Sequence, residues 1–194
     1  MSEKPLSIII PSRGRLGKLK TALASIRREE AGPDGLAVIV VCDGDPETAK
    51  ALEGDALVDR IILNPKQRGS VFCRNLATAS AEGSVICAMD DIEFREGAIA
   101  AAVEALAREF PDRDGVVGFI LEKTKHSPTS IALTGQAFLR RHPGRRLYYP
   151  GYFHFACQEL AAASISLGKF YQEPQALVVH HHPREGGASP DKTH

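Results

Sequence analysis

Residues 84–91 of the chain read SVICAMDD, a short apolar run followed at once by the carboxylates of Asp90 and Asp91. A continuous apolar run of this length is typical of a strand covered on both faces in a parallel sheet. Two adjacent carboxylates repel each other unless a cation neutralises them, and Mg²⁺ and Mn²⁺ prefer oxygen ligands of this kind. The alternative is that one aspartate caps a following helix. This stretch alone leaves both interpretations open.

Strands and helices alternate on either side of this stretch, which predicts a single α/β domain. Its central sheet is expected to be mostly parallel, with helices on both faces. Residues 183–194 are polar and rich in Pro and Gly, which predicts a disordered tail after a domain of residues 1–182. Apolar runs predict strands at 6–10 (ending at Pro11), 37–42, 58–63, 84–89, 116–121 and 176–180. Apolar spacing predicts helices at 16–28, 47–53, 70–81 (stopped by Gly83) and 95–110, and helical turns near Gln136 and Gln158.

Composition excludes several classes of protein. The chain has 194 residues, 43% of them apolar, which is ordinary for a globular domain. The 24 Lys and Arg residues balance 24 Asp and Glu residues, and a net charge of zero argues against general nucleic-acid binding. No apolar run approaches the roughly 20 residues that a membrane-spanning helix needs, and a cytoplasmic protein is expected. The four cysteines lie in strand-like or helix-like runs, so free thiols are expected.

Polar residues follow three of the predicted strands: Pro11-Ser12-Arg13, Asp43-Gly44-Asp45 and Asp90-Asp91. In open α/β sheets ligands bind beyond the carboxyl ends of the strands, so these three ends are expected to converge on one crevice. Asp43 is suited to accept a hydrogen bond from a base N–H or a ribose hydroxyl, and Gly44 would let a ligand approach closely. A simple Asp-Gly turn is the alternative.

A predicted helix start at residues 68–75 adds cationic donors to this edge. Arg68, Gly69 and Arg74 surround the first helical turn, where backbone N–H groups and guanidinium groups suit a phosphate or a carboxylate. An arginine paired with a structural acid is equally compatible with the pattern.

Taken in this order, the motifs resemble family 2 glycosyltransferases of the GT-A fold over residues 6–182. The resemblance implies a Rossmann-like domain that takes a UDP- or GDP-linked sugar, with Mn²⁺ or Mg²⁺ as cofactor, and passes the sugar to an acceptor that the sequence does not define. By resemblance, the residues that bind the nucleotide sugar are Pro11, Ser12, Arg13, Arg15, Asp43, Arg68, Arg74 and Asp90, and the metal ligands are Asp91 and His180.

The chain departs from the family pattern at three positions. Met89 stands where the family often has the first Asp of its acidic motif, and Ala156-Cys157 stand where it has the Glu-Asp pair that supplies the base. Glu159 is therefore the candidate base, because a general base needs only a carboxylate within hydrogen-bond reach of the acceptor hydroxyl. The alternative is a surface glutamate on a helix. His180 likewise has a solvated chain end as its alternative.

The resemblance favours an inverting glycosyltransferase but leaves two competitors. A degenerate, non-catalytic protein that binds a nucleotide sugar is consistent with the three departures. A sugar nucleotidyltransferase is the other, since residues 12–17 (SRGRLG) form a thin version of the Gly-rich, basic loop of that class.

Overall fold

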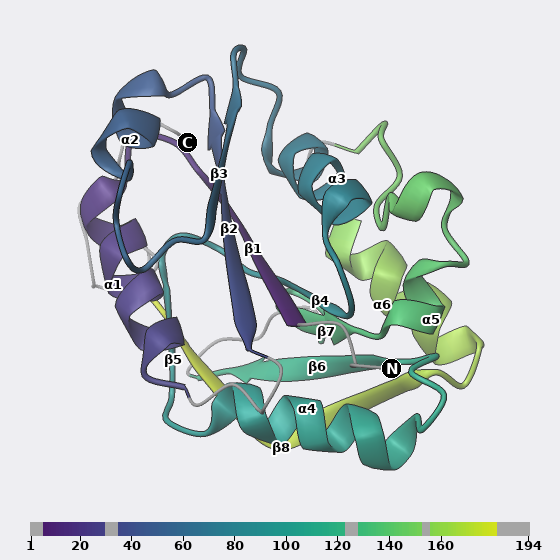
Figure 1. The fold of residues 1–194 in the computed structure, drawn as a ribbon. Helices are drawn as coiled ribbons and strands as arrows, with labels where there is room; N and C mark the ends of the chain where they lie inside the picture. Colours follow the sequence, from purple (N-terminus) through teal and green to yellow (C-terminus); the bar gives the residue numbers. More distant parts are fainter. Residues whose placement is uncertain (1–5, 30–34, 123–127, 153–155, 182–194) are drawn as a thin grey trace.

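The computed structural model describes residues 6–29, 35–122, 128–152 and 156–181 as one mixed sheet with helices on both faces (Figure 1). The eight strands lie in the order β3-β2-β1-β4-β7-β6-β8-β5. The strands are β1 (Leu6–Ser12), β2 (Leu36–Asp43), β3 (Arg60–Asn64), β4 (Val85–Cys87), β5 (Ile92–Phe94), β6 (Val116–Leu121), β7 (Ala132–Thr134) and β8 (Phe170–His180). The helices are α1 (Leu16–Arg27), α2 (Pro46–Ala51), α3 (Ser70–Ser80), α4 (Ala98–Glu109), α5 (Gln136–Leu139), the 3₁₀ turn η1 (Pro143–Arg145) and α6 (Ala156–Ser166).

The predicted α/β architecture is confirmed, and the sheet is mostly parallel. The pairs β1–β2, β2–β3, β1–β4 and β6–β8 are parallel. The pairs β4–β7, β6–β7 and β5–β8 are antiparallel. The parallel half that contains β1, β2 and β4 brings three carboxyl ends to one edge, as the sequence predicts.

Alternation along the central strands buries both faces of the sheet. Ile8 and Ile10 of β1 pack in a core with α1, α2 and α4, whereas Ile9 packs in a second core with α3, α5 and α6. All three isoleucines are fully buried. Figure 1 shows α1 and α2 together on the left and α3, α5 and α6 together on the right. Each strand of this half therefore needs apolar residues on both sides, which explains its continuous apolar runs.

The sequence predicts that the first strand ends at Pro11, but in the structure β1 continues to Ser12. Pro11 is buried and lies opposite Val41 of β2. Pairing of β1 with β4 ends at Ile9, so the missing N–H of Pro11 interrupts no ladder on that side. The extra two residues carry the Ser12 side chain to the edge of the sheet.

Two short strands are absent from the sequence-based prediction, and several boundaries differ from it. The strands β5 and β7 have three residues each, too few for a period to be recognised, and β5 lies directly before the helix that is predicted from 95. The strand β4 is limited to Val85–Cys87, within the predicted 84–89, and β3 begins at Arg60 rather than 58. The helix α4 begins only at Ala98, after Gly97 at φ 77°. The helix α3 ends at Ser80, before Gly83. The strand β8 begins at Phe170 rather than 176, with Pro174 between its two paired stretches.

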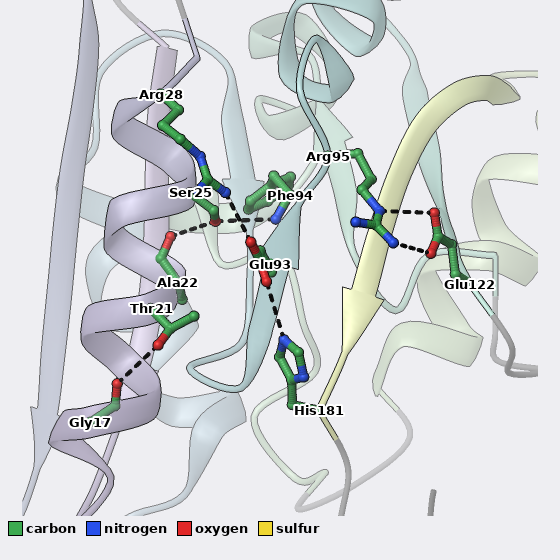
Figure 2. Close-up of polar contacts among 10 residues, drawn as sticks. All are labelled: Gly17, Thr21, Ala22, Ser25, Arg28, Glu93, Phe94, Arg95, Glu122 and His181. Atoms are coloured by element: carbon green, nitrogen blue, oxygen red, sulfur yellow. Dashed lines mark hydrogen bonds and ion pairs between the residues drawn. The ribbon is translucent and has the colours of Figure 1, made fainter. Parts of the chain in front are cut away.

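Polar contacts fix β5 between α1 and β8 (Figure 2). Ser25 Oγ donates to the Ala22 carbonyl at 2.7 Å and accepts the Phe94 N–H at 3.1 Å. Glu93 lies 2.9 Å from Arg28 Nη2 and 3.5 Å from His181 Nε2. These contacts hold the short strand in register, so the residues at its start are positioned by α1 and β8 together.

The structure tests the predictions about the cysteines and about membrane-spanning helices, but not the prediction about the tail. All four cysteines are free, and three of them are buried. The predicted disordered tail at 183–194 lies outside the described residues. In the described part of the chain, no helix is long and apolar enough to cross a bilayer.

Candidate active site

The acidic pair lies at the turn between β4 and β5, against the end of β1. Ser12 Oγ donates to Asp90 Oδ2 at 2.8 Å. The Nη1 atom of Arg15 lies 3.1 Å from Asp90 Oδ1 and 3.3 Å from Asp91 Oδ2. The two aspartates are only 6% and 5% exposed. The positively charged guanidinium of Arg15, from the loop after β1, thus lies between the two carboxylates.

Asp91 also faces the closing strand. The Nε2 atom of His180 lies 3.4 Å from Asp91 Oδ1, and each of these side chains is 6% exposed. The register of the β5–β8 pair places Ile92 opposite His180, which brings Asp91 next to it. The backbone N–H of His181 donates to the Asp91 carbonyl at 2.8 Å. His182 lies outside the described residues.

The helix-cap interpretation of the acidic pair is wrong. The next element after Asp91 is β5, and the following helix α4 begins at Ala98 behind Gly97. Neither Asp90 nor Asp91 caps a helix, and their carboxylates turn towards Arg15 and the strand ends. Met89, at the position of the family's first acidic residue, instead packs against the core.

The two carboxyls differ in their acidity. Burial raises the pKa of Asp90, and the neighbouring Asp91 raises it further, against the opposing effects of Arg15 and Ser12. Burial alone would raise the pKa of Asp91 too, but His180, Arg15 and Lys18 outweigh it, and the pKa of Asp91 is lowered. Asp91 is therefore the carboxyl that stays ionised most readily.

Asp91 and His180 form the pair best suited to hold a divalent ion. Mg²⁺ and Mn²⁺ bind in proteins through one or two side chains and complete their coordination with substrate phosphates and water. Among the described residues, no cluster of three His, Cys, Asp or Glu side chains is arranged to hold an ion by itself. A carboxylate and an imidazole that face each other fit an ion whose other ligands come from a bound diphosphate.

The carboxylate of Asp43 holds the loop that precedes α3. It accepts the backbone N–H groups of Arg68 and Gly69, each at 2.8 Å, and the Asn64 side-chain amide at 2.8 Å. This arrangement fixes the N-terminus of α3 beside the end of β2. The guanidinium of Arg68 itself lies over the Phe72 ring, 3.9 Å from its centroid.

Close approach at Gly44 involves the protein's own backbone. A Cβ atom at Gly44 would lie 2.7 Å from the Gln67 nitrogen, and Gly44 has a φ of +65°. The interpretation that Gly44 makes room for a ligand is replaced by one in which it makes room for residues 66–67. The next residue, Asp45, accepts the Gly14 N–H at 2.7 Å and the Thr48 N–H at 3.0 Å.

Arg13 also belongs to this junction of loops. Burial tends to raise the pKa of Asp45, but hydrogen bonds from Thr48 and Gly14 and the nearby charge of Arg13 lower it. The loops after β1 and β2 are therefore tied to each other through Asp45.

Arg74 is a cation of α3 that has no carboxylate partner in the described part of the chain. Its Nη2 donates to the Ala88 carbonyl at 3.1 Å, and its guanidinium carbon lies 5.9 Å from the centroid of the Tyr148 ring. The Nε atom of Arg74 is buried and has no hydrogen-bond partner among the described residues. The alternative in which this arginine pairs with a structural acid is thereby excluded for the described residues, and the orphaned donor suits an anionic ligand.

Glu159 lies in the first turn of α6 and is exposed. Burial lowers the pKa of nearby His142, and the charge of Glu159 partly opposes that effect. Ala156 and Cys157 form the start of the same helix, as the family spacing predicts, and neither carries a carboxylate. The structure thus places the predicted base on the side of the molecule formed by α5 and α6.

Three residues help to organise the site through contacts that the sequence-based prediction does not include. Asp45 caps α2, and its signal is the Asp-Pro pair that typically opens a helix. Asn64 braces Asp43 from the end of β3, and Asn75 Nδ2 donates to the Tyr148 carbonyl at 2.7 Å. Both asparagines act over long sequence separations, and no local pattern marks them.

Comparison with known proteins assigns the chain to a family. Residues 7–165 match the model of glycosyl transferase family 2. This match covers most of the chain, which therefore belongs to that family. No curated protein sequence matches it.

Solved structures confirm the GT-A fold. The mannosyltransferase PcManGT from Pyrobaculum calidifontis, in complex with GDP-Man and Mn²⁺, has a TM-score of 0.73 and 19% identity. That match covers 96% of this chain and 59% of PcManGT. S. aureus TarS 1–349 in complex with UDP-GlcNAc has a TM-score of 0.72 and 15% identity, over 90% of this chain and 58% of TarS 1–349. The chain thus spans less than two thirds of the length of these structures.

Proposed function

We propose that this chain transfers a sugar from a nucleotide-diphosphate donor, with UDP or GDP as its nucleotide, to an acceptor hydroxyl. One observation carries the proposal: Arg74, whose buried Nε has no hydrogen-bond partner among the described residues, donates to the Ala88 carbonyl beside the Asp90–Arg15–Asp91 group. An arginine that pairs with no carboxylate in the described part of the chain, next to two acids held by one arginine, suits a diphosphate and its counter-ion. The donors bound by PcManGT and TarS support this substrate class.

In this proposal the residues at the strand ends share the work of binding the donor. Asp43 and the loop that it holds receive the nucleoside, and Arg74 with Arg68 steadies the diphosphate. Pro11, Ser12, Arg13 and Arg15 form the opposite wall, in the loop after β1. Ser12 fixes the orientation of Asp90 by its 2.8 Å hydrogen bond.

Asp91 and His180 are the residues that would hold Mn²⁺ or Mg²⁺, with Asp90 beside them. A bound divalent ion supplies positive charge that stabilises the negative charge developing on the leaving diphosphate. Arg15 lowers the repulsion between the two carboxylates before any ligand binds, because its guanidinium contacts both of them. The presence of Mn²⁺ in the PcManGT structure supports the assignment.

Glu159 is our candidate for the base that accepts the proton of the acceptor hydroxyl. The acceptor oxygen would attack the anomeric carbon as its proton passes to Glu159, and the bond from that carbon to the diphosphate oxygen would break on the opposite side. This single displacement would invert the configuration. Positioning the two substrates and stabilising the departing charge then contribute most of the rate enhancement.

Calorimetric titration of UDP and of GDP, each with and without Mn²⁺, tests the donor site. We expect metal-dependent binding of one nucleotide, and a loss of about tenfold or more in affinity for Arg74→Ala. Arg60→Ala is the matched control, since among the described residues the exposed Arg60 side chain contacts only Ser80 Oγ, at 3.2 Å. Absence of metal-dependent binding of either nucleotide would contradict the proposal.

A second candidate function is donor binding without catalysis. The observation that favours it is the start of α6, where Ala156 and Cys157 supply no carboxylate. Donor hydrolysis by wild type and by Glu159→Gln separates the two. A fall of about 100-fold in the variant supports a catalytic Glu159, whereas binding without any turnover in either protein supports the binding role.

A further inference from the structure

Two exposed tyrosines form an aromatic pair in the loop between η1 and α6. Tyr149 is 62% exposed and Tyr152 is 43% exposed. Their ring centroids are 5.5 Å apart, with an interplanar angle of 76°, which is the edge-to-face arrangement. The two rings therefore present a joint aromatic surface that a ligand can reach.

A hydrogen bond and a proline restrict the turn that carries the pair. The Tyr152 N–H donates to the Tyr149 carbonyl at 3.2 Å, which closes a four-residue turn with Pro150 at its second position. Proline at that position presets the backbone angle of the turn. The Tyr149 ring lies over Gly151, where a Cβ atom would come 2.5 Å from a ring carbon. These contacts limit the arrangements open to the pair, which lowers the entropic cost of binding.

The turn is anchored to the candidate donor site. Tyr148, the residue before it, is buried, and Arg74 lies 5.9 Å from its ring centroid. The Asn75 side chain forms two hydrogen bonds with the backbone of Tyr148, at 2.7 and 2.9 Å. Because α3 supplies both Arg74 and Asn75, the exposed pair is fixed relative to the cation that would hold the diphosphate.

From this placement we propose that Tyr149 and Tyr152 form the platform on which an acceptor saccharide stacks, an inference that rests on the proposed glycosyl transfer. A pyranose ring presents a face of C–H groups whose partial positive charge matches the negative face of an aromatic ring. The tyrosine hydroxyls add hydrogen-bonding groups at the edge of the rings. Because the rings lie at 76° to each other, one ring can lie against a sugar face while the other contacts the edge of the same sugar.

Saccharide binding can be measured by tyrosine fluorescence and by saturation-transfer NMR. The chain contains no tryptophan and four tyrosines, so its intrinsic fluorescence comes from tyrosine. The probes are glucose, galactose, mannose, N-acetylglucosamine and their β-1,4-linked disaccharides, tested by saturation-transfer NMR and tyrosine fluorescence. Each is measured alone and with Mn²⁺ plus UDP or GDP.

In wild type we expect saturation transfer to at least one saccharide, and we expect that saccharide to change the tyrosine fluorescence of the protein. Tyr149→Ala and Tyr152→Ala should each reduce the saccharide affinity by about tenfold, and Tyr149→Phe, which keeps the ring, should restore most of it. Tyr171→Phe is the control, because Tyr171 lies in β8 beside Arg108. The thermal melting temperature of each variant confirms that it is folded.

The outcomes separate the two proposals. Saccharide binding that survives both alanine substitutions, or no binding to any probe, overturns the platform while nucleotide binding leaves the donor site intact. A fluorescence change that UDP or GDP alone causes in wild type, and that is lost in both alanine variants, also overturns it, since the pair would then belong to the donor. Failure of nucleotide binding with ring-dependent saccharide binding would instead contradict the donor site only.

Discussion

The Nη1 atom of Arg15 lies 3.1 Å from Oδ1 of Asp90, so one arginine from the loop after β1 neutralises acids from the turn after β4. It also contacts Asp91 at 3.3 Å, and its side chain is only 14% exposed. Removing one partner from such a group leaves two nearly buried carboxylates facing each other. We regard this contact as the main electrostatic support of the site in the absence of a ligand.

Arg15→Ala should lower the free energy of unfolding by about 3 kcal/mol, because uncompensated charge remains in a poorly solvated place. Chemical denaturation at neutral pH measures this. Arg28→Ala is the control, since the Arg28–Glu93 pair lies at the surface and should contribute less than about 1 kcal/mol. Adding Mn²⁺ should stabilise Arg15→Ala more than wild type. Equal stability of the two variants would contradict this account.

Asp90→Asn should stabilise the fold while removing one carboxylate from the proposed donor site. The pKa of Asp90 is raised in the folded state, chiefly by burial, so folding favours its protonated form. The resulting cost is absent below the unfolded pKa of about 4 and grows as pH rises towards the folded pKa. We expect the variant to melt about 2–4 °C higher at pH 7, which corresponds to about 1 kcal/mol. The difference should shrink towards pH 4 in thermal scans; a variant less stable at pH 7 would show the charge to be favourable.

Asn75→Ala should lower the free energy of unfolding more than a typical substitution on α3. The side chain satisfies both the N–H and the carbonyl of Tyr148, and both groups would lose their partner in a buried place. A cost of about 2–4 kcal/mol is expected in denaturant titrations. Ser80→Ala, whose exposed hydroxyl donates to the Ala77 carbonyl and accepts from Arg60 Nη1, should cost less than about 0.5 kcal/mol. Similar costs for the two would mean that the Tyr148 loop is held by other contacts.

Gly44→Ala and Gly14→Ala separate steric from conformational requirements. Both glycines have a φ of +65°, but a Cβ atom meets nothing within 4 Å at Gly14 and lies 2.7 Å from the Gln67 nitrogen at Gly44. Gly14→Ala should cost about 1 kcal/mol for its backbone angle alone. Gly44→Ala should cost about 3 kcal/mol, because the backbone of residues 66–67 must move as well. Equal losses in melting experiments would show that this contact relaxes freely.

The sequence predicts the fold well where each strand is buried on both faces. The apolar runs of β1, β2 and β6 are long enough to identify, and the helix starting at Leu16 agrees with the structure. The strands β5 and β7 have three residues each and are held by neighbours far away in the sequence, as the Ser25–Phe94 bond shows. No local pattern could have indicated them.

For the site, sequence reasoning identifies the right strand ends but not their internal partners. It places Asp90, Asp91 and His180 in one group, and they lie together. It assigns Asp43 to a ligand, which stays a prediction, and it does not foresee that this carboxylate also accepts the N–H groups of Arg68 and Gly69. Such pairings depend on three-dimensional proximity across 25 residues or more, which composition and spacing do not encode.

The most direct test of the central claim is a crystal of the full chain soaked with Mn²⁺ and UDP or GDP, with the metal located by its anomalous scattering. We expect a metal peak about 2.1 Å from a carboxylate oxygen of Asp91 and within bonding distance of His180. The diphosphate should lie between this metal and Arg74. A bound nucleotide whose diphosphate lies away from Arg74, or a metal peak that contacts neither Asp91 nor His180, would contradict the central claim.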